Sequence, residues 1–179
     1  VENTCKKRFE WQLGKLPLGY DHKYIYTHVG FNMKITDMQA ACGLGQLINL
    51  ESFIEKRKKN VLFLKKQLTE LQDEILLPEA EINSDPSWFG FPITLKKNSR
   101  FKRTDIIKKL TENNIGTRLL FAGNLTKQPA YISKNFKVQG NLEITDLIMS
   151  NTFWVGVQPA IGEEELIFVS KIIKEFFKK

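Results

Sequence analysis

The chain has 179 residues, of which 42% are hydrophobic and 26% are charged, and its formal net charge is +7. The length suits one large domain with a buried core. No apolar run is long enough to cross a bilayer, and two cysteines are too few for a disulfide scaffold, so both of those classes are excluded. We therefore predict a protein of the reducing cytoplasm that has no membrane partner.

Residues 1–36 have the composition of loops and short extended segments. Gly14, Pro17, Gly19 and Gly30 interrupt every helical or strand period in this part of the chain. Such a segment cannot bury a core of its own. We interpret it as the end of a larger structural part, so that the chain as a whole is expected to be a piece of a longer protein.

A long helical stretch is predicted over residues 37–75. Thr36 and Gln39 have the spacing of a capping box, in which each side chain accepts a hydrogen bond from the backbone amide of the other residue. Apolar residues then recur at helical spacing, and Pro78 marks the latest possible end. The pattern leaves open whether one bent helix or two helices are present. Cys42, which lies among small residues near the start, is interpreted as a small core residue.

The remaining residues, 76–179, alternate between strand and helix patterns and are predicted to form an α/β domain. Alternate residues from Phe89 to Leu95 are apolar, whereas Pro92 lacks an amide hydrogen and indicates an edge strand or a bulge. The expected domain has about three strands with helices on one face of the sheet. The predicted strands are 88–95, 115–121 and 152–157, and the predicted helices are 104–114, 145–150 and 162–178.

The positive charge comes mostly from lysines that alternate with glutamates along the predicted helices. A surplus of cations can indicate nucleic-acid binding, but no aromatic RNA-binding strand and no zinc-finger spacing accompany it. A solvated, lysine-rich surface is the simpler interpretation, and an anionic small substrate can use a few of these cations. We therefore predict no nucleic-acid partner.

The titratable residues form no general catalytic motif. The two histidines, His22 and His28, do not have metal-ligand spacing, and no glycine-rich phosphate loop or nucleophile elbow is present. Cys5 lies beside three consecutive cations. The residues alone leave it as an incidental surface thiol, a reactive thiolate, or one ligand of a site whose other ligands are missing.

The stretch from Thr27 to Leu47 reads THVGFNMKITDMQAACGLGQL and resembles the signature of the DegT/DnrJ/EryC1/StrS family. Members of this family are pyridoxal-phosphate-dependent sugar aminotransferases and related dehydrases of fold type I. Their usual signature is close to Gly-Tyr-Asn-Tyr-Arg-Met-Ser-Asp-Ile-Gln-Ala-Ala, and this chain follows it with Lys34 in place of the arginine. The resemblance implies that the chain holds the small C-terminal domain of that fold and a long interdomain helix.

Four further stretches resemble one branch of the family, the CDP-4-keto-6-deoxyglucose 3-dehydrases, whose members act in the synthesis of 3,6-dideoxyhexoses for lipopolysaccharide O-antigens. The resemblance covers essentially all of the chain and implies three parts. Residues 1–36 match the large-domain, cluster-loop and dimer-interface region, residues 37–75 match the interdomain helix region, and residues 76–179 match the C-terminal α/β domain. The stretches are NTCKKRFEWQLG at 3–14, SDPSWFGFPIT at 84–94, GTRLLFAGNLTKQP at 116–129 and NTFWVGVQP at 151–159.

The resemblance assigns a cofactor-binding role to Asn32 and a pocket-lining role to Phe89. In the family the asparagine of this motif reaches across a homodimer interface to the cofactor phosphate of the neighbouring subunit, to which a side-chain amide can donate. A turn asparagine that bonds its own backbone is the alternative. Aminotransferases of the family often have histidine at the position of Phe89, and a phenyl ring cannot move protons, as expected of the dehydrases. A core phenylalanine on a strand is compatible with this assignment.

The resemblance places Arg118, Asn124 and His28 near the substrate. The planar guanidinium of Arg118 suits the substrate's pyrophosphate, and an ordinary salt bridge is the alternative. His28 precedes the signature asparagine and can line the interface, or it can be a packed histidine. The resemblance assigns no catalytic residue to this chain, because the catalytic groups of the family lie upstream of the matching part.

Two cofactors are implied for the full-length enzyme: pyridoxamine or pyridoxal 5'-phosphate, and a [2Fe–2S] cluster. In the dehydrases a histidine replaces the Schiff-base lysine, and that residue lies upstream of the matching part. Cys5 matches the last of the four cluster ligands, and the other three also lie upstream. One thiolate cannot hold such a cluster, so we expect Cys5 to be metal-free and neither cofactor to bind the chain alone.

The implied reaction is the removal of the C3 hydroxyl from a nucleotide sugar similar to CDP-4-keto-6-deoxyglucose. The implied partners are a second copy of the chain and an NADH-dependent flavin and iron–sulfur reductase that supplies electrons. The chain alone is expected to be inactive. Two alternatives stay open: a pyridoxal-phosphate-dependent nucleotide-sugar aminotransferase of the same family, and a non-catalytic interaction module or remnant.

Overall fold

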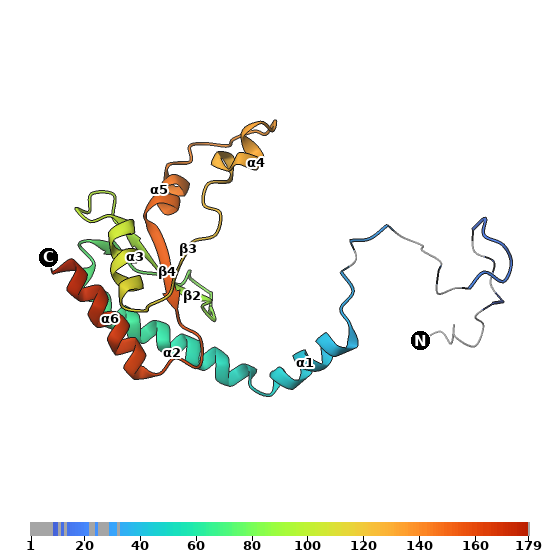
Figure 1. The fold of residues 1–179 in the computed structure, drawn as a ribbon, viewed down its shortest axis with the longest axis horizontal. Helices are drawn as coiled ribbons and strands as arrows, with labels where there is room; N and C mark the ends of the chain where they lie inside the picture. Colours follow the sequence, from blue (N-terminus) through green and yellow to red (C-terminus); the bar gives the residue numbers. More distant parts are fainter. Residues whose placement is uncertain are drawn as a thin grey trace. The chain divides into compact units, whose positions relative to one another are not determined.

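The computed structural model describes residues 9–10, 12, 14–21, 24, 29–31 and 33–178. The chain divides into two compact units, one that ends at Gly45 and one from Gln46 to Lys179 (Figure 1), and each is considered by itself. Within the described residues, no helix is both long and apolar enough to cross a membrane.

The first unit ends in helix α1 (Asp37–Leu47), which begins with the predicted capping box. The amide of Gln39 donates to Oγ1 of Thr36 at 3.3 Å, and the amide of Thr36 donates to Oε1 of Gln39 at 2.8 Å. No residue of α1 is buried, and the thiol of Cys42 is exposed. The prediction that Cys42 is a core residue is therefore wrong for this chain, because nothing in the described part covers the small-residue face of α1.

The long helical stretch consists of two helices rather than one bent helix. Helix α2 (Leu50–Leu68) follows a turn in which the amide of Asn49 donates to the carbonyl of Gln46 at 3.0 Å. A short 3-10 helix, η3 (Thr69–Leu71), follows α2 and ends before Pro78, as predicted.

The second unit contains a four-stranded antiparallel sheet with the strand order β1-β2-β4-β3. The strands are β1 (Ile75–Leu76), β2 (Gly90–Leu95), β3 (Thr117–Leu119) and β4 (Thr152–Gly156). The three predicted strands are all present, although each is shorter than predicted. Strand β1 is too short for its two residues to show a period, so the sequence pattern could not predict it. The α/β fold class is confirmed.

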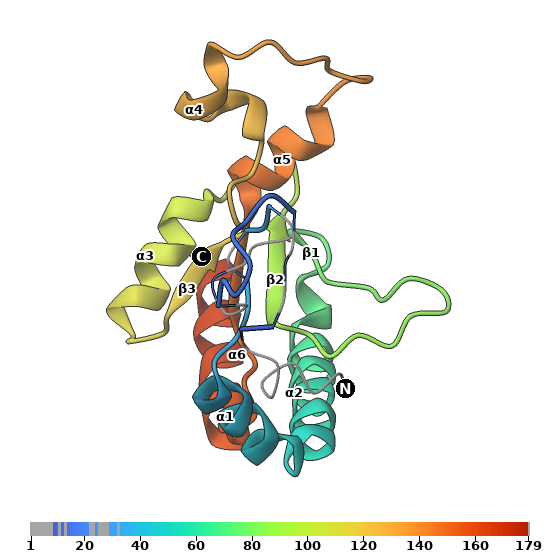
Figure 2. The ribbon, with the colours of Figure 1, turned by 90° about the vertical axis from the view of Figure 1, so that its right-hand side faces the viewer.

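One face of the sheet is covered by helices α2, α3 (Arg103–Glu112) and α6 (Glu163–Phe177), as Figures 1 and 2 show. Residues of β2 and β4 alternate between this buried face and the opposite face. The buried apolar residues therefore form one core between the sheet and these helices. They are Val61, Leu64, Leu68, Ile75, Phe91, Ile93, Leu95, Ile106, Leu110, Ile115, Phe153, Val155, Val157, Leu166, Ile172, Ile173, Phe176 and Phe177.

Pro92 lies in β2, which is an inner strand and not an edge strand as one reading of the sequence suggested. Strand β1 pairs with β2 only through Leu95 and Thr94, so it ends before it reaches the proline. On its other side Pro92 is the register partner of Trp154 in β4. The missing amide hydrogen of the proline is tolerated because the short neighbouring strand does not extend to this position.

The connection from β3 to β4 carries three short helices: η4 (Leu125–Lys127), α4 (Pro129–Ile132) and α5 (Glu143–Asn151). Only α5 was predicted, because the other two are too short to show a helical period. The closing helix α6 was predicted, and three glutamates occupy its first turn, where the helix dipole favours negative charge.

Candidate substrate-binding site

The predicted site residues fall into two groups. Cys5, His28 and Asn32 lie outside the described residues. Phe89 and Arg118 both lie next to Trp154, since Phe89 contacts its ring and Arg118 is its register partner across β3 and β4. Phe89, Arg118 and the loop that follows β3 are therefore brought to one region of the sheet, on the face opposite the helices.

A slot of about 210 Å³ lies on this face of the sheet, and we call it the aromatic slot. It contains no histidine, lysine, arginine or carboxylate, so no lining side chain can carry a charge at neutral pH. Its lining residues are Trp88, Phe89, Gly90, Pro92, Leu120, Phe121 and Trp154.

The indole ring of Trp154 is held from three sides. A side chain at Gly90 would come within 2.3 Å of the indole, so the ring lies directly against the glycine backbone. The ring of Phe89 meets the indole edge-on, with the two centroids 5.2 Å apart. The indole Nε1 donates to the carbonyl of Leu119 at 3.1 Å. These contacts fix the ring before any ligand arrives.

The segment that carries Trp88 and Phe89 is attached to helix α2 by two cations. Arg57 donates to the carbonyl of Trp88 at 3.2 Å, and Lys58 contacts the carboxylate of Asp85 at 2.6 Å. The hydrogen bond from Lys58 to Asp85 raises the pKa of the lysine, an effect opposed by its partial desolvation. Helix α2, which packs in the core, thus positions the aromatic residue that precedes β2.

Arg118 is exposed on β3, on the same face as Trp154 because direct register partners share a face. Its guanidinium donates to the carbonyl of the preceding residue, Thr117, at 2.9 Å. None of the ion pairs found among the described residues involves Arg118. Its charge therefore remains free to meet an anion, and its role toward the substrate stays a prediction.

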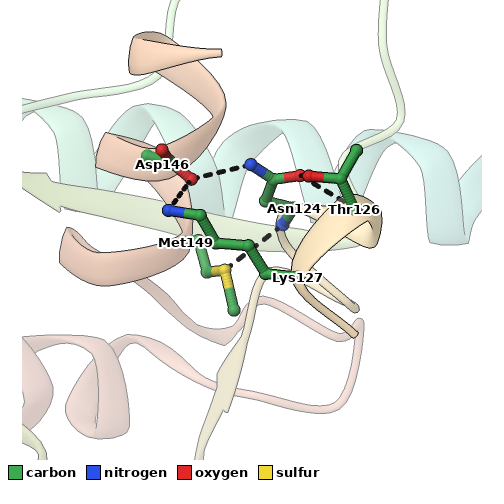
Figure 3. Close-up of polar contacts among 5 residues, drawn as sticks. All are labelled: Asn124, Thr126, Lys127, Asp146 and Met149. Carbon is green, nitrogen blue, oxygen red and sulfur yellow. Dashed lines mark hydrogen bonds and ion pairs between the residues drawn. The ribbon is translucent and has the colours of Figure 1, made fainter. Parts of the chain in front are cut away.

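Asn124 is buried, and both polar atoms of its side chain are hydrogen-bonded inside the protein (Figure 3). Its Nδ2 donates to Oδ1 of Asp146 at 2.7 Å, and its Oδ1 accepts from the amide and the hydroxyl of Thr126 at 3.0 and 2.7 Å. Its backbone amide lies 3.4 Å from the sulfur of Met149. This geometry suits a residue that fixes the loop after β3, and the predicted contact with substrate remains untested.

Asp146 of α5 joins this network through a second partner. Its Oδ1 lies 2.8 Å from Nζ of Lys127 in η4 (Figure 3). The hydrogen bond from Lys127, followed by the one from Asn124, lowers the pKa of the Asp146 carboxyl below its usual value. The ionised carboxylate therefore ties the loop after β3 to α5.

The same loop has an unusual backbone at Phe121 and Gly123. Phe121 has a φ of 48° and Gly123 a φ of 63°, both in the left-handed region that L side chains rarely adopt. A side chain at Gly123 would lie 2.6 Å from Cγ of Met149. The loop is thus held tightly against α5, and Phe121 is presented to solvent with 80% of its surface exposed.

The described residues do not by themselves make a site for either implied cofactor. No group of three or more histidine, cysteine or acidic side chains lies close enough within the described part to hold a metal. The lining of the aromatic slot has two side-chain N–H groups, the indoles of Trp88 and Trp154, and that of Trp154 is taken by the carbonyl of Leu119. The slot and the neighbouring Arg118 instead suit a ligand in which a planar apolar group is joined to an anionic group.

Sequence reasoning missed Trp154, Gly90 and Phe121 as site residues. Trp154 lies at an outward position of β4 between the buried Phe153 and Val155, and this alternation of apolar residues could have found it. The contact between Gly90 and Trp154 joins residues far apart in the chain, and it depends on the register of β2 against β4.

Comparison with known proteins relates the chain to one family and to a solved fold. Residues 12–174 match the model of the DegT/DnrJ/EryC1/StrS aminotransferase family. The chain is 54% identical over 98% of its length to the lipopolysaccharide biosynthesis protein RfbH of Salmonella typhimurium, and 45% identical over its whole length to dTDP-4-dehydro-2,6-dideoxy-D-glucose 3-dehydratase of Saccharopolyspora spinosa. It spans 40% and 38% of the lengths of these relatives.

Among solved structures, the chain shares the fold of part of the E. coli GDP-4-keto-6-deoxy-D-mannose-3-dehydratase with bound hydrated PLP. The TM-score is 0.76 at 22% identity, and the match covers 84% of this chain and 38% of the solved one. This similarity shows the fold, which is that of a segment of a pyridoxal-phosphate enzyme.

Proposed function

The chain belongs to the DegT/DnrJ/EryC1/StrS aminotransferase family, and from this we propose that it is part of a nucleotide-sugar 3-dehydratase that uses pyridoxamine phosphate. The substrate is a 4-keto-6-deoxy hexose carried on a nucleoside diphosphate, of which CDP-4-keto-6-deoxyglucose is the first candidate. The product serves the synthesis of dideoxyhexoses for lipopolysaccharide O-antigens.

The observation that carries this choice within the family is the phenyl ring of Phe89 in the aromatic slot. Aminotransferases of the family often have histidine at this position, and a histidine can accept and return a proton near neutral pH. The slot has no titratable side chain, so it leaves proton transfer to other groups. Both relatives described above support the proposal, since one is named as a 3-dehydratase and the other as a lipopolysaccharide biosynthesis protein.

The residues of this chain would act by binding and orienting the substrate. Arg118 offers an unpaired cation to the diphosphate, and Asn124 holds the loop that lies between Arg118 and helix α5. When bound, pyridoxamine phosphate supplies an amine for the C4 ketone and an electron sink. The assignments of Asn32 to the cofactor phosphate and of Cys5 to a [2Fe–2S] cluster rest on the family resemblance.

The proposal includes a cytoplasmic homodimer that receives electrons from an NADH-dependent flavin and iron–sulfur reductase. A cytoplasmic site agrees with the low cysteine content. The second copy is proposed because the family's signature asparagine, here Asn32, serves the site of the neighbouring subunit. An asparagine-to-alanine change at this position in the full-length homodimer should weaken cofactor binding, and unchanged cofactor affinity would remove this assignment.

The test is an activity assay on a protein that contains this segment and is as long as its relatives. The protein is supplied with pyridoxamine phosphate, CDP-4-keto-6-deoxyglucose, NADH and a reductase of the stated kind. The expected product has lost one oxygen atom, detected by mass spectrometry. A product that has instead gained an amino group in the presence of an amino donor would establish the aminotransferase, which is the second candidate because the family is named for that activity.

The 179-residue chain by itself should give no product and should not bind iron at cluster stoichiometry. The reason is that the chain spans only about two fifths of the length of its relatives, and the described residues form no metal site. Turnover by the chain alone, or stoichiometric iron in it, would contradict this expectation. A full-length protein that also lacks both activities would favour the non-catalytic interaction module.

A further inference from the structure

A second pocket, which we call the basic pocket, lies at the end of β2. Its volume is about 340 Å³, and it is lined by residues that follow β2, by the start of α3 and by the end of α5. Four of its lining residues are cations, namely Lys96, Lys97, Lys102 and Arg103, and none of the lining residues is acidic. It shares no lining residue with the aromatic slot, so the two are separate features of the second unit.

The four cations of the basic pocket are not neutralised by the protein. None of the ion pairs found among the described residues involves any of them. Two carboxylates contact lining residues, but both do so through hydroxyl groups: Ser99 donates to Oε2 of Glu74 at 2.6 Å, and Thr104 donates to Oδ1 of Asp105 at 3.3 Å. Like charges around one pocket repel one another, and a bound anion removes this repulsion.

Arg103 is held in place by one side of its guanidinium and has an unpaired N–H group elsewhere. Its Nη1 donates to the carbonyl of Met149 at 2.5 Å and to the carbonyl of Thr152 at 3.3 Å, which fixes it to the end of α5 and the start of β4. Its Nε is buried and has no hydrogen-bond partner in the described part of the chain. A buried N–H of a cation is costly without an acceptor, so this group calls for an anion or another acceptor beside it.

The start of α3 adds backbone donors to the same pocket. The amides of Arg103 and Thr104 are the first two of this ten-residue helix, and the first amides of a helix have no acceptor within it. No hydrogen bond found between described residues uses either amide, and the side chain of Lys102 does not cap the helix. The positive end of the helix dipole lies here as well. Unpaired amides and this dipole together favour an anion.

We propose that the basic pocket binds a phosphate group, either as inorganic phosphate or as the phosphate monoester of a small molecule. Nε of Arg103 and the amides at the start of α3 donate to the phosphate oxygens, and the lysines neutralise the charge. Phosphate has acceptor oxygens on all sides, so it can meet donors that come from three segments, whereas the two oxygens of a carboxylate lie in one plane. The inference is independent of the proposed function, because the basic pocket contains no residue assigned to substrate or cofactor.

The experiment is a titration of the 179-residue chain with inorganic phosphate at constant ionic strength, followed through the backbone amide signals in heteronuclear NMR. The amide signals of Arg103 and Thr104 should shift and saturate as expected for one site. Sodium chloride at the same ionic strength should leave them in place. A second titration with glycerol 3-phosphate distinguishes the two sources of the phosphate group. Tighter binding than inorganic phosphate would indicate a phosphorylated small molecule, and weaker binding would indicate free phosphate.

The contribution of the lysines is tested by removing their charges. Lys97 and Lys102 are exposed, so their replacement should not unfold the chain. Lys97→Gln and Lys102→Gln should each weaken phosphate binding about threefold, and the double variant should weaken it about tenfold. Lys108→Gln is the matched control, since Lys108 is an exposed lysine of α3 that does not line the pocket. Phosphate binding to this control should stay as in the parent chain.

The role of Arg103 is tested by a change that keeps its charge. Arg103→Lys removes the planar guanidinium with its Nε donor and should weaken phosphate binding about tenfold, with circular dichroism to check that the variant is folded. Arg118→Gln should leave phosphate binding unchanged, because Arg118 lies outside the basic pocket. This second variant separates the basic pocket from the cation that is assigned to the diphosphate of the substrate.

Several results would overturn the inference. The first is a folded chain in which phosphate at millimolar concentration does not shift the signals at the start of α3. The second is a shift that chloride reproduces, and the third is a shift that Arg118→Gln abolishes but Lys102→Gln does not change. The fourth is a single-stranded oligonucleotide that binds far more tightly than phosphate and with a steep salt dependence, because the pocket would then belong to a nucleic-acid surface.

Discussion

At the scale of single residues, buried side chains of this chain organise loops and exposed ones are available for ligands. Asn124 was predicted to contact substrate, and the structure shows its amide engaged with Asp146 and Thr126. Arg118, predicted from the same stretch of sequence, is exposed and unpaired with any described carboxylate. The two predictions remain untested, but their geometries differ: one residue can reach a ligand directly, and the other can act through the loop that it holds.

The ionised form of Asp146 should contribute to stability in a pH-dependent way. Its pKa is lower in the folded chain than in the unfolded chain, because Lys127 and Asn124 donate to the carboxylate. A lowered carboxyl pKa adds stability above the unfolded pKa, and this stability is lost as the pH falls through the folded value. The difference in urea midpoint between the parent chain and Asp146→Asn should therefore shrink as the pH is lowered from 7 toward 3.

The control for this prediction is Glu143→Gln, which changes another carboxylate in the first turn of α5. Glu143 takes part in none of the ion pairs found among the described residues. Glu143→Gln should show a smaller dependence on pH than Asp146→Asn. An equal difference at pH 7 and pH 3 for Asp146→Asn would contradict the assignment.

At the scale of elements, helix α2 connects the core to the candidate site. Its buried face contributes Val61, Leu64 and Leu68 to the core, and Arg57 and Lys58 hold the segment that carries Phe89. Asn60, also buried, donates to the carbonyl of Val157 just after β4 at 3.3 Å. Changes in α2 are therefore expected to affect both stability and the aromatic slot.

Two leucines of α2 offer a matched pair for measuring its contribution to stability. Leu64 is fully buried, whereas Leu62 exposes 65% of its surface. Leu64→Ala should lower the free energy of unfolding by about 2–5 kcal/mol, because it removes buried methyl groups and leaves a cavity. Leu62→Ala should change it by about 0.5 kcal/mol or less. Urea denaturation followed by circular dichroism measures both, and similar losses for the two variants would show that α2 is not packed as described.

At the scale of the whole molecule, the chain consists of two units that differ in burial. No residue of α1 is buried, whereas every buried apolar residue of the core lies between Val61 and Phe177. The predicted parts 1–36, 37–75 and 76–179 place the last boundary after α2. The division found in the structure falls at Gly45, so α2 lies in the same unit as the sheet. The boundary after residue 75 stays a prediction.

A pair of truncations tests where the folded unit begins. Residues 46–179 should unfold cooperatively with the same urea midpoint as the full chain, because all of the core residues are retained. Residues 76–179 should not unfold cooperatively, because they lack the α2 side of the core. A cooperative transition in residues 76–179 would support the predicted boundary instead. Loss of the transition in residues 46–179 would show that the first unit contributes to the core.

The sequence by itself determined the elements with a clear period and the family. The capping box at Thr36 and helices α2, α3, α5 and α6 were predicted, and so were strands β2, β3 and β4 with longer bounds, because burial on one face leaves a period of 3.6 or 2 in the order of residues. The signature around Gly30 indicated the family, and the comparisons confirm it. Cys42 was misjudged, because small residues on a helix indicate that a neighbour can approach closely but not that one is present.

Only the tertiary structure decided how the candidate site is assembled. Trp154 meets Gly90 because β2 pairs with β4 in one register, and a shift by one residue would turn the indole toward the helices. The register of β3 against β4 places Arg118 beside the indole, and the short pairing of β1 with β2 leaves Pro92 without a neighbour on its β1 side. No local pattern contains this information, since register is set by contacts between residues that are far apart in the chain.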